Sequence, residues 1–311
     1  MKQIKNFMLF AAALLVISSC TKDVPCPDQS IYSDDDIPAR NEFDMWLLKN
    51  YTFPYNIEFN YLYNDKLSDN YYNVVPATVE NSKALAILVK HVWLDAYAEQ
   101  AGDNFLRNNA FRVFQLIGSP EYNSQGSIVL GTAEGGIQVT LFRVNELDMD
   151  DIYVNQDEPY RDHYAKPLDL NYWYFHTMHH EFCHILTQKK NYTTDFQAIS
   201  AGKYHSADWI NVDDEEAPLE GFVSGYASGE YNEDFAEVYS KYVTSSDAAW
   251  KEILNHGVSG SDTSGRDAII AKLEIVKSYL LDSWGIDLEE LREIVLRRSS
   301  EAPSLDLRTL N

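Results

Sequence analysis

The chain has 311 residues, and its 48 acidic residues outnumber its 25 lysines and arginines, which gives a formal charge of −23 at pH 7. A surface this acidic repels the phosphates of nucleic acids, so we expect no nucleic-acid partner. The three cysteines, Cys20, Cys26 and Cys183, are too few for a framework of disulfides.

The N-terminus has the pattern of a bacterial secretion signal. Two lysines precede an apolar run over residues 7–17, which is too short to span a bilayer but suits the core of a signal peptide. The sequence Ile17-Ser18-Ser19-Cys20 then resembles a lipobox, in which the cysteine is lipidated and becomes the new N-terminus. We therefore expect residues 1–19 to be a lipoprotein signal peptide and Cys20 to carry a lipid that anchors the protein to a membrane.

The next segment differs in composition from the rest of the chain. Residues 20–40 contain three prolines and an acidic run from Asp34 to Asp36, a composition typical of a flexible linker. We predict that this segment is a tether. The remaining residues, 41–311, then form the functional domain, which is long enough to bury one large core.

The first part of this domain is rich in aromatic residues. Aromatic residues alternate in places between Tyr51 and Tyr63, which predicts a strand, and Pro54 favours a position at a sheet edge. Apolar residues then recur with helical spacing, which predicts a helix over residues 82–101 that ends at Gly102.

Three further strands are predicted, over residues 111–117, 127–131 and 137–144. Two glycines join the last two strands, so we expect a hairpin at an edge of the sheet. One hypothesis is that an extended peptide substrate lies against the strand at 137–144. An ordinary hairpin without a binding role explains the same pattern.

Residues 148–167 predict a loop, and residues 171–188 predict a mostly apolar helix that contains the most informative motif. His180, Glu181 and His184 form an H-E-x-x-H sequence. Side chains four residues apart lie about 40° from each other around a helix, so the two imidazoles can hold one zinc ion. Glu181 lies at the edge of that face, where a carboxylate can take a proton from an attacking water molecule.

Three other residues near this motif have a less specific interpretation. Cys183 lies inside the same helix, and we expect a small core residue because the histidines already supply ligands. Residues 191–217 have little periodicity and predict a long excursion over the site. His205 and Asp208 in this excursion are interpreted as solvated loop residues, with metal ligation as the alternative.

A second informative segment covers residues 220–243, where acidic residues open a helix, as the helix dipole favours. Catalytic zinc usually has three protein ligands, and this helix is the best source of the third. Glu233 and Glu237 are four residues apart and share a face. Either of them is a candidate ligand, as is Asp234 if the helix docks differently.

The last part of the chain predicts helices over residues 248–255, 268–281 and 288–297. The domain is therefore expected to have an α+β fold. A small mixed sheet would lie beside the metal-binding helix, and the C-terminal half would be mostly helical.

These motifs resemble the active-site pattern of zinc peptidases of the anthrax lethal factor and Pro-Pro endopeptidase type. The shared features are the H-E-x-x-H helix, a tyrosine seven residues before a glutamate, and a following Phe-Ala-Glu sequence. The resemblance implies a zincin-like metallopeptidase fold. It also implies one Zn²⁺ ion per chain, with His180, His184 and Glu233 as the ligands.

The same resemblance assigns the remaining roles at the site. It implies that Glu181 is the general base and that Tyr226 stabilises the oxyanion. Glu237 then holds a ligand histidine in place, as carboxylates near metal sites do. Ligation by Glu237 and a packing role for Tyr226 are the alternatives.

The chain is also similar to a family of putative zinc-binding metallopeptidase lipoproteins of Bacteroidetes. The similarity is carried by the lipobox and by the motifs at residues 179–186, 221–227 and 233–237. It implies a lipid-anchored protein of the outer membrane, on the cell surface or the periplasmic face. Members of the family are often encoded beside outer-membrane nutrient-uptake systems, which implies such a complex as a partner.

Two functions are compatible with these features. The first is a zinc-dependent endopeptidase that hydrolyses a peptide or protein substrate. The second is a non-catalytic surface lipoprotein that contains zinc and binds glycan or peptide for nutrient uptake. The presence of Glu181 favours the enzyme, because a purely structural zinc site needs no base.

Overall fold

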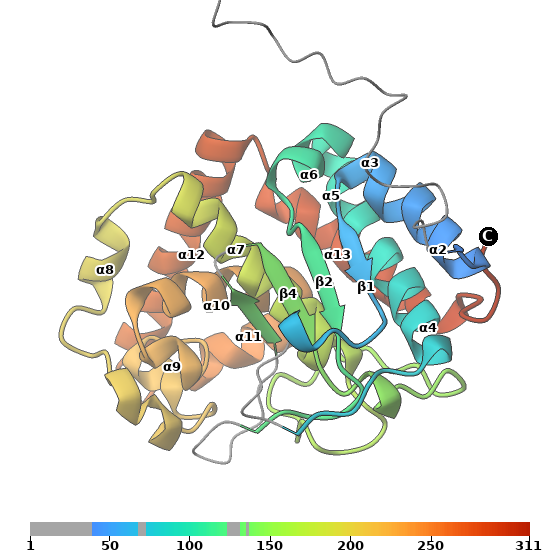
Figure 1. The fold of residues 1–311 in the computed structure, drawn as a ribbon. Helices are drawn as coiled ribbons and strands as arrows, with labels where there is room; N and C mark the ends of the chain where they lie inside the picture. The colour runs from blue at the N-terminus through green and yellow to red at the C-terminus, as the bar shows by residue number, and fades with distance from the viewer. Residues whose placement is uncertain (1–38, 68–72, 123–130, 135–136) are drawn as a thin grey trace, which may run out of the picture. The chain divides into compact units, whose positions relative to one another are not determined.

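A four-stranded mixed sheet positions the helices that carry the site (Figure 1). The computed structural model describes residues 39–67, 73–122, 131–134 and 137–311. The strands follow the order β1-β2-β4-β3. The first three are parallel, and β3 is antiparallel to β4. Their bounds are β1 Glu58–Asn60, β2 Val113–Leu116, β3 Gly131–Glu134 and β4 Gln138–Leu141.

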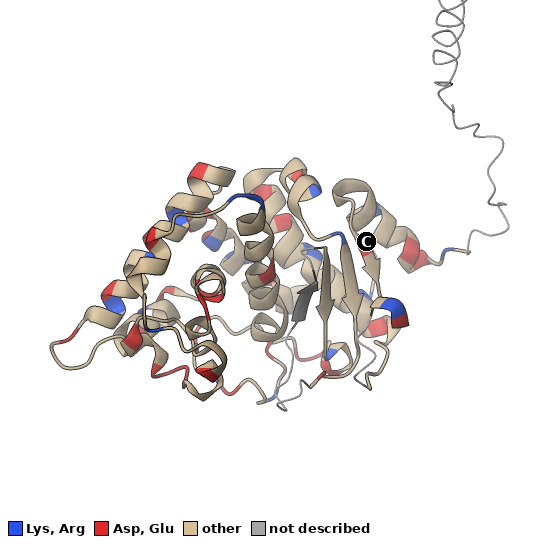
Figure 2. Cartoon of the chain, turned by 60° about the vertical axis from the view of Figure 1, so that its left-hand side comes forward, with Lys and Arg blue, Asp and Glu red and all other residues tan. Residues whose placement is uncertain are grey.

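The two central strands show why one face of the sheet is covered by helices. Phe114 and Leu116 of β2 pair with Val139 and Leu141 of β4, and all four side chains are buried. Side chains alternate between the two faces of a strand, so these residues make one apolar face. Acidic residues, by contrast, are spread over many of the helices and loops (Figure 2).

The predicted strand between Tyr51 and Tyr63 is mostly wrong. The chain is helical to Tyr55, and only Glu58–Asn60 forms a strand, which does lie at an edge of the sheet. The reason is that Leu47, Tyr51 and Tyr55 are four residues apart and all buried, which is helical spacing. The N-terminal helical segments are α2 Glu42–Leu47, η3 Leu48–Thr52, α3 Phe53–Tyr55 and η4 Asp65–Leu67.

The predicted helix at 82–101 is confirmed as a continuous helical segment that begins at Val79 and ends before Gly102, whose φ is +79°. Its middle turn carries Trp93, whose ring lies 6.4 Å from Phe114 of the sheet. The segment consists of α4 Val79–Val89, η5 Lys90–Leu94 and α5 Asp95–Ala101, and α6 Asp103–Asn109 follows.

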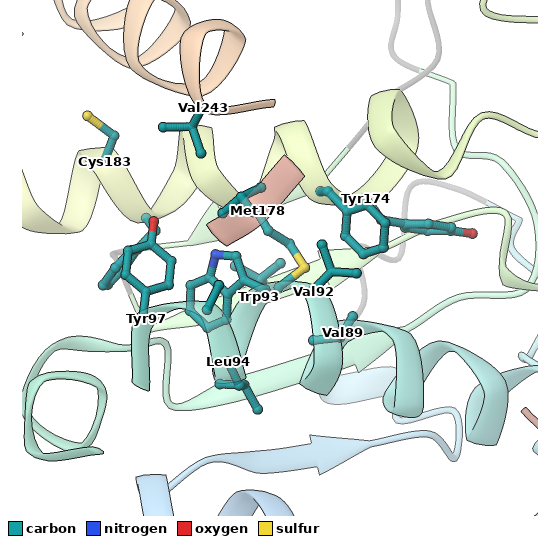
Figure 3. Close-up of a cluster of buried hydrophobic side chains, with 14 of the residues drawn as sticks. Val89, Val92, Trp93, Leu94, Tyr97, Tyr174, Met178, Cys183 and Val243 are labelled. Atoms are coloured by element: carbon teal, nitrogen blue, oxygen red, sulfur yellow. The ribbon is translucent and has the colours of Figure 1, made fainter. Parts of the chain in front are cut away.

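The helix with the H-E-x-x-H motif, which the sequence predicts to be metal-binding, packs directly on this segment. It is formed by η7 Asn171–His176 and α7 Thr177–Lys189, as predicted. Phe182 lies 5.2 Å from Trp93 between ring centroids. Figure 3 shows Met178 directed from the metal-binding helix toward Trp93 and Val92. These apolar contacts fix the helix that carries the H-E-x-x-H motif to the centre of the core.

The order of the strands corrects the hypothesis about the hairpin. The predicted hairpin pairing is present between β3 and β4, but β4 also pairs with β2. Residues 137–144 are therefore central in the sheet, and β3 is the edge strand. An interior strand has its backbone groups satisfied on both sides and cannot pair with a substrate. Most of the predicted strand at 127–131 lies outside the described residues.

The C-terminal half is helical, as expected, and the loop predicted at 148–167 is confirmed apart from a single bridge at Tyr153. Helix α10 packs against α7, α12 and α13. The helical segments after β4 and beyond the metal-binding helix are η6 Val144–Glu146, α8 Asp195–Ile199, η8 Ser206–Asn211, α9 Ala217–Glu220, η9 Tyr226–Ser228, α10 Tyr231–Thr244, α11 Asp247–His256, α12 Ser264–Trp284, α13 Leu288–Glu301 and η10 Ala302–Ser304.

Residues 42–311 form one compact unit. The signal peptide at 1–19, Cys20 and nearly all of the tether at 20–40 lie outside the described residues. Among the helices that the structure describes, none combines the length and apolar character that a membrane span requires.

Candidate metal centre

Three histidines at intervals of four residues lie along one face of the helix formed by η7 and α7. His176 and His180 are buried, and His184 is partly exposed. The helix that faces them is α10, which contributes Glu233 and Glu237. Because residues four apart share a helix face, two such faces in contact bring imidazoles and carboxylates together.

Three donor atoms converge at the outer end of this interface. The Nε2 atom of His180 lies 2.9 Å from Oε2 of Glu233, and Nε2 of His184 lies 3.3 Å from the same oxygen. The two Nε2 atoms are 3.1 Å apart. The three residues therefore form a triangle of potential ligand atoms.

This triangle fits a zinc ion. Nitrogen and oxygen ligands of tetrahedral zinc lie about 2.0–2.2 Å from the metal, which places them about 3.3–3.5 Å from each other. The observed separation of 3.3 Å agrees with this spacing, and those of 2.9 and 3.1 Å are slightly smaller. The donor set of two imidazoles and one carboxylate is that of catalytic zinc sites, which keep a fourth position for water or substrate.

Glu237, the other carboxylate on this face of α10, lies behind His180 and is buried. Oε1 of Glu237 is 2.9 Å from Nδ1 of His180 and 2.9 Å from Nε2 of His176. Its other oxygen accepts a hydrogen bond of 2.6 Å from the hydroxyl of Ser224. Glu237 therefore acts on the outward-facing Nε2 of His180 indirectly, by fixing the ring through Nδ1.

The charges at this interface are coupled. Burial opposes ionisation of Glu233, but hydrogen bonds from His180 and His184 hold its pKa well below the usual range. The pKa of Glu237 is likewise held low by His176 and His180, against the effect of burial. Burial lowers the pKa of His180, but its hydrogen bonds to the two carboxylates raise it to about 10. The cluster therefore favours a positive charge between its carboxylates, either a proton or a metal ion.

Glu181 lies beside this triangle, on the wall of a cavity. Burial raises the pKa of its carboxyl group, and the nearby His180 and His184 oppose that shift. A general base works best when its pKa is near the working pH. The environment of Glu181 raises its pKa toward neutral pH.

Tyr226 reaches the site from η9, the short helical segment before α10. Its ring lies 5.7 Å from that of His180 and 4.9 Å from that of Trp209, and its side chain is 37% exposed. Burial and the neighbouring Glu233 carboxylate, with which it shares a hydrogen bond, raise the pKa of the phenol. The hydroxyl therefore stays protonated and can donate a hydrogen bond at the cavity wall.

The predicted loop residues lie away from the triangle. His205 is 2.7 Å from the carboxylate of Glu220, and Asp208 is exposed in η8. Asp234, which was an alternative ligand, points to the other side of α10 and forms a buried ion pair of 2.6 Å with Lys272. Cys183 is buried in the core, as expected.

Sequence reasoning missed His176 and Ser224. The spacing of His176, four residues before His180, was a signal that this residue shares the metal-binding face. Ser224 lies in the motif at residues 221–227 that carries the family resemblance, but no spacing rule links it to Glu237, which is 13 residues away.

A cavity of about 620 Å³ borders the triangle. Its walls come from α7, the segment after it, η9 and the start of α10. The lining residues are Glu181, His184, Ile185, Thr187, Gln188, Asn191, Tyr192, Thr194, Gln197, Tyr226, Glu230, Tyr231, Asn232 and Glu233. The candidate base, two candidate ligands and the tyrosine thus face one space that a substrate can enter.

The contacts of Glu237 lead to a first prediction. We expect Glu237→Gln to weaken zinc binding about 10- to 100-fold, the usual cost of losing a carboxylate that orients a ligand histidine. Competition titration against a zinc chelator measures this change. Glu252→Gln, which changes an exposed carboxylate on α11, is the control. Unchanged zinc affinity in Glu237→Gln would contradict an orienting role.

Comparison with known proteins agrees with this geometry. The model of a family described as "Putative zinc-binding metallo-peptidase" matches residues 36–289. The crystal structure of a putative zinc-binding metallo-peptidase from Bacteroides caccae ATCC 43185 has 40% sequence identity to this chain and a TM-score of 0.70. The match covers 88% of this chain and 99% of the other. A search of curated proteins gave no match.

These matches bear on two predictions made from the sequence. The expected metallopeptidase fold is confirmed, with a mixed sheet and a largely helical C-terminal half. The resemblance to the zinc-binding metallopeptidases of Bacteroidetes is confirmed as well, because the family model spans most of the chain. The chain therefore belongs to the putative zinc-binding metallo-peptidase family.

Proposed function

We propose that the protein is a zinc-dependent endopeptidase, with one zinc ion held by His180, His184 and Glu233. The observation that carries this proposal is the triangle of Nε2, Nε2 and Oε2 atoms at the wall of a cavity that also contains Glu181. When bound, zinc supplies a Lewis acid that acidifies water and polarises a carbonyl oxygen. A structural zinc site would have no use for the adjacent base.

Three side chains of the protein carry out the remaining steps. Glu181 takes the proton from the attacking water and passes it to the nitrogen of the leaving amine. The hydroxyl of Tyr226 donates a hydrogen bond to the oxygen on which negative charge develops. Glu237 holds the imidazole of His180 through Nδ1 while these steps occur.

The edge of the sheet is the proposed support for the substrate backbone. β3 lies beside α7 and, among the described residues, pairs with β4 alone. The free edge of a strand can bind an extended peptide through backbone hydrogen bonds. Binding of this kind does not require a chain terminus, which favours cleavage within a chain.

Loss of the Tyr226 hydroxyl provides the second prediction. We expect Tyr226→Phe to lower kcat about 100-fold while KM changes little, because one hydrogen-bond donor to the transition state is removed. Steady-state kinetics on a cleaved peptide measures the two constants. A purely packing role for Tyr226 predicts no such fall, since the ring that contacts Trp209 is retained.

Digestion of a peptide library tests the proposed function. The zinc-loaded protein is incubated with the library, and the products are read by mass spectrometry, beside a sample with chelator and one with zinc restored. Cleavage inside peptides that disappears with chelator and returns with zinc supports the proposal. Absence of cleavage in all samples, with one zinc ion per chain measured, would contradict it and favour a binding protein for glycan or peptide.

We also propose that Cys20 carries a lipid that anchors the protein to the outer membrane, where it serves a nutrient-uptake complex. The sequence Ile17-Ser18-Ser19-Cys20 supports lipidation. Metabolic labelling with an alkyne fatty acid tests it. Label in the wild-type protein and none in Cys20→Ala is the expected result, and equal label in both would contradict it.

A further inference from the structure

The chemistry of the cavity beside the metal centre limits which side chains it can accept. Amide and hydroxyl groups from Thr187, Gln188, Asn191, Gln197 and Asn232 line part of its wall. A large apolar side chain placed there would cover these groups without satisfying their hydrogen bonds, which is costly. The cavity volume of about 620 Å³ leaves room for a long side chain.

Carboxylates are the main charged side chains on the cavity wall. Its lining residues include three carboxylates, Glu181, Glu230 and Glu233, and no lysine or arginine. Glu233 faces the histidines and Glu181 is the proposed base, so Glu230 is the carboxylate that neither role uses. Glu230 is exposed, and its carboxylate accepts a hydrogen bond of 3.3 Å from the amide of Asn232. The phenol ring of Tyr231, 38% exposed, lines the same cavity.

A second hollow of about 450 Å³ shares a wall with the first. Asn191 and Tyr192 line both hollows. Glu274 and Asp282 of α12 contribute carboxylates to the second hollow, and its lining residues again include no lysine or arginine. Glu274 already forms an ion pair of 3.2 Å with Lys277. A peptide that leaves the metal centre on this side therefore meets carboxylates in two successive hollows.

We propose that the substrate carries a lysine or arginine next to the cleaved bond, whose side chain binds in the first hollow beside Glu230 and Tyr231. This inference rests on the proposed peptidase function and names its substrate class. A carboxylate next to an aromatic ring binds a cation by charge and by cation–π interaction. A cleft lined by carboxylates, without lysine or arginine, also concentrates cationic ligands. A second basic residue of the peptide binds in the second hollow, beside Asp282.

The acidity of the whole chain is the competing explanation. Acidic residues occur on helices and loops throughout the described fold (Figure 2), so some would line any hollow. Many of them, however, pair with a cation, as Glu99 does with Arg297 and Asp150 with Arg308. Among the described residues, Glu230 and Asp282 have no ion pair with lysine or arginine. Their charges are thus available to a ligand.

Kinetics on matched peptides tests the preference in the wild-type protein. Peptides that differ at one position, with arginine, norleucine or glutamate next to the cleaved bond, are compared by kcat/KM. We expect arginine to exceed glutamate about tenfold or more, and Glu230→Gln to reduce that ratio about fivefold, the size of one partly exposed ion pair. Raising the salt concentration should also reduce it. Glu293→Gln, an exposed carboxylate on α13, should leave it unchanged.

Binding measurements separate this inference from the proposed peptidase function. Fluorescence anisotropy with Glu181→Gln compares the same arginine and glutamate peptides without turnover. Tighter binding of the arginine peptide, reduced by adding Glu230→Gln but not Glu293→Gln, supports the inference even if the wild-type protein cleaves nothing. Equal binding of both peptides, equal cleavage of both, or an equal loss in Glu293→Gln would overturn it.

Discussion

Glu181→Gln is expected to lower kcat/KM by about two to four orders of magnitude while zinc remains bound. The range is the usual contribution of a general acid–base group. Glutamine keeps the size of the side chain but cannot take up a proton. The three proposed ligands, His180, His184 and Glu233, are untouched by the change, so the metal content should stay at one ion per chain.

The measurement pairs steady-state kinetics with metal analysis of the same samples. Glu252→Gln, on α11 and away from the cavity, controls for the loss of one negative charge. Full activity in Glu181→Gln would remove the base from the mechanism. Loss of zinc together with activity would instead show that Glu181 contributes to metal binding.

The helices of the site could be predicted because their signal is local. On a helix, His180 and His184 share a face whatever the rest of the chain does. Their spacing and the apolar residues around the motif predict the helix that the structure has at Asn171–Lys189. The same reasoning explains why α10 was expected near its observed start. The apolar periodicity of a helix is a property of its own segment and does not depend on which elements pack against it.

The choice between Glu233 and Glu237 could not be made from spacing, because both residues lie on one face of α10. Packing separates them in the structure. Glu237 is buried between His176, His180 and Ser224, whereas Glu233 lies at the cavity. That difference depends on how two helices dock, and residues more than 50 positions apart determine it.

The order of strands in the sheet also depends on contacts between residues that are far apart in the sequence. The hairpin between β3 and β4 was predictable from its short connection, but the parallel pairing of β2 with β4 was not. That pairing makes β4 an interior strand and moves the free edge to β3. The segment from Leu47 to Tyr55 shows a different limit, since its aromatic residues fit both strand alternation and helical spacing.

Removal of zinc should abolish activity and make stability depend strongly on pH. Without metal, both nitrogens of His180 lie 2.9 Å from carboxylate oxygens, and its pKa rises to about 10. A histidine whose folded-state pKa is raised adds stability that is complete below its unfolded pKa of about 6.5 and is lost as the pH rises toward 10. Each unit of pKa difference is worth about 1.4 kcal/mol, so we expect a loss of a few kcal/mol.

The carboxylates set the acidic limit of the same profile. The pKa values of Glu233 and Glu237 are held below their usual range, so their contribution is complete above about pH 4.5 and is lost as the pH falls. The metal-free protein should therefore be most stable between about pH 4.5 and 6.5. Zinc binds the unprotonated imidazoles and competes with protons, so its affinity rises with pH.

Denaturant titrations at pH 6, 8 and 9.5, with zinc or with chelator, measure this difference. We expect the free energies of unfolding of the two samples to differ least at pH 6 and most at pH 9.5. At pH 9.5 the metal-free protein has lost the proton on His180, whereas the zinc-loaded protein is stabilised by the bound ion. His205→Gln changes the histidine of a histidine–glutamate pair outside the site and should leave the difference intact. If the difference in free energy of unfolding between zinc-loaded and metal-free protein were the same at all three pH values, then the proton and the metal would not share His180 as their binding site.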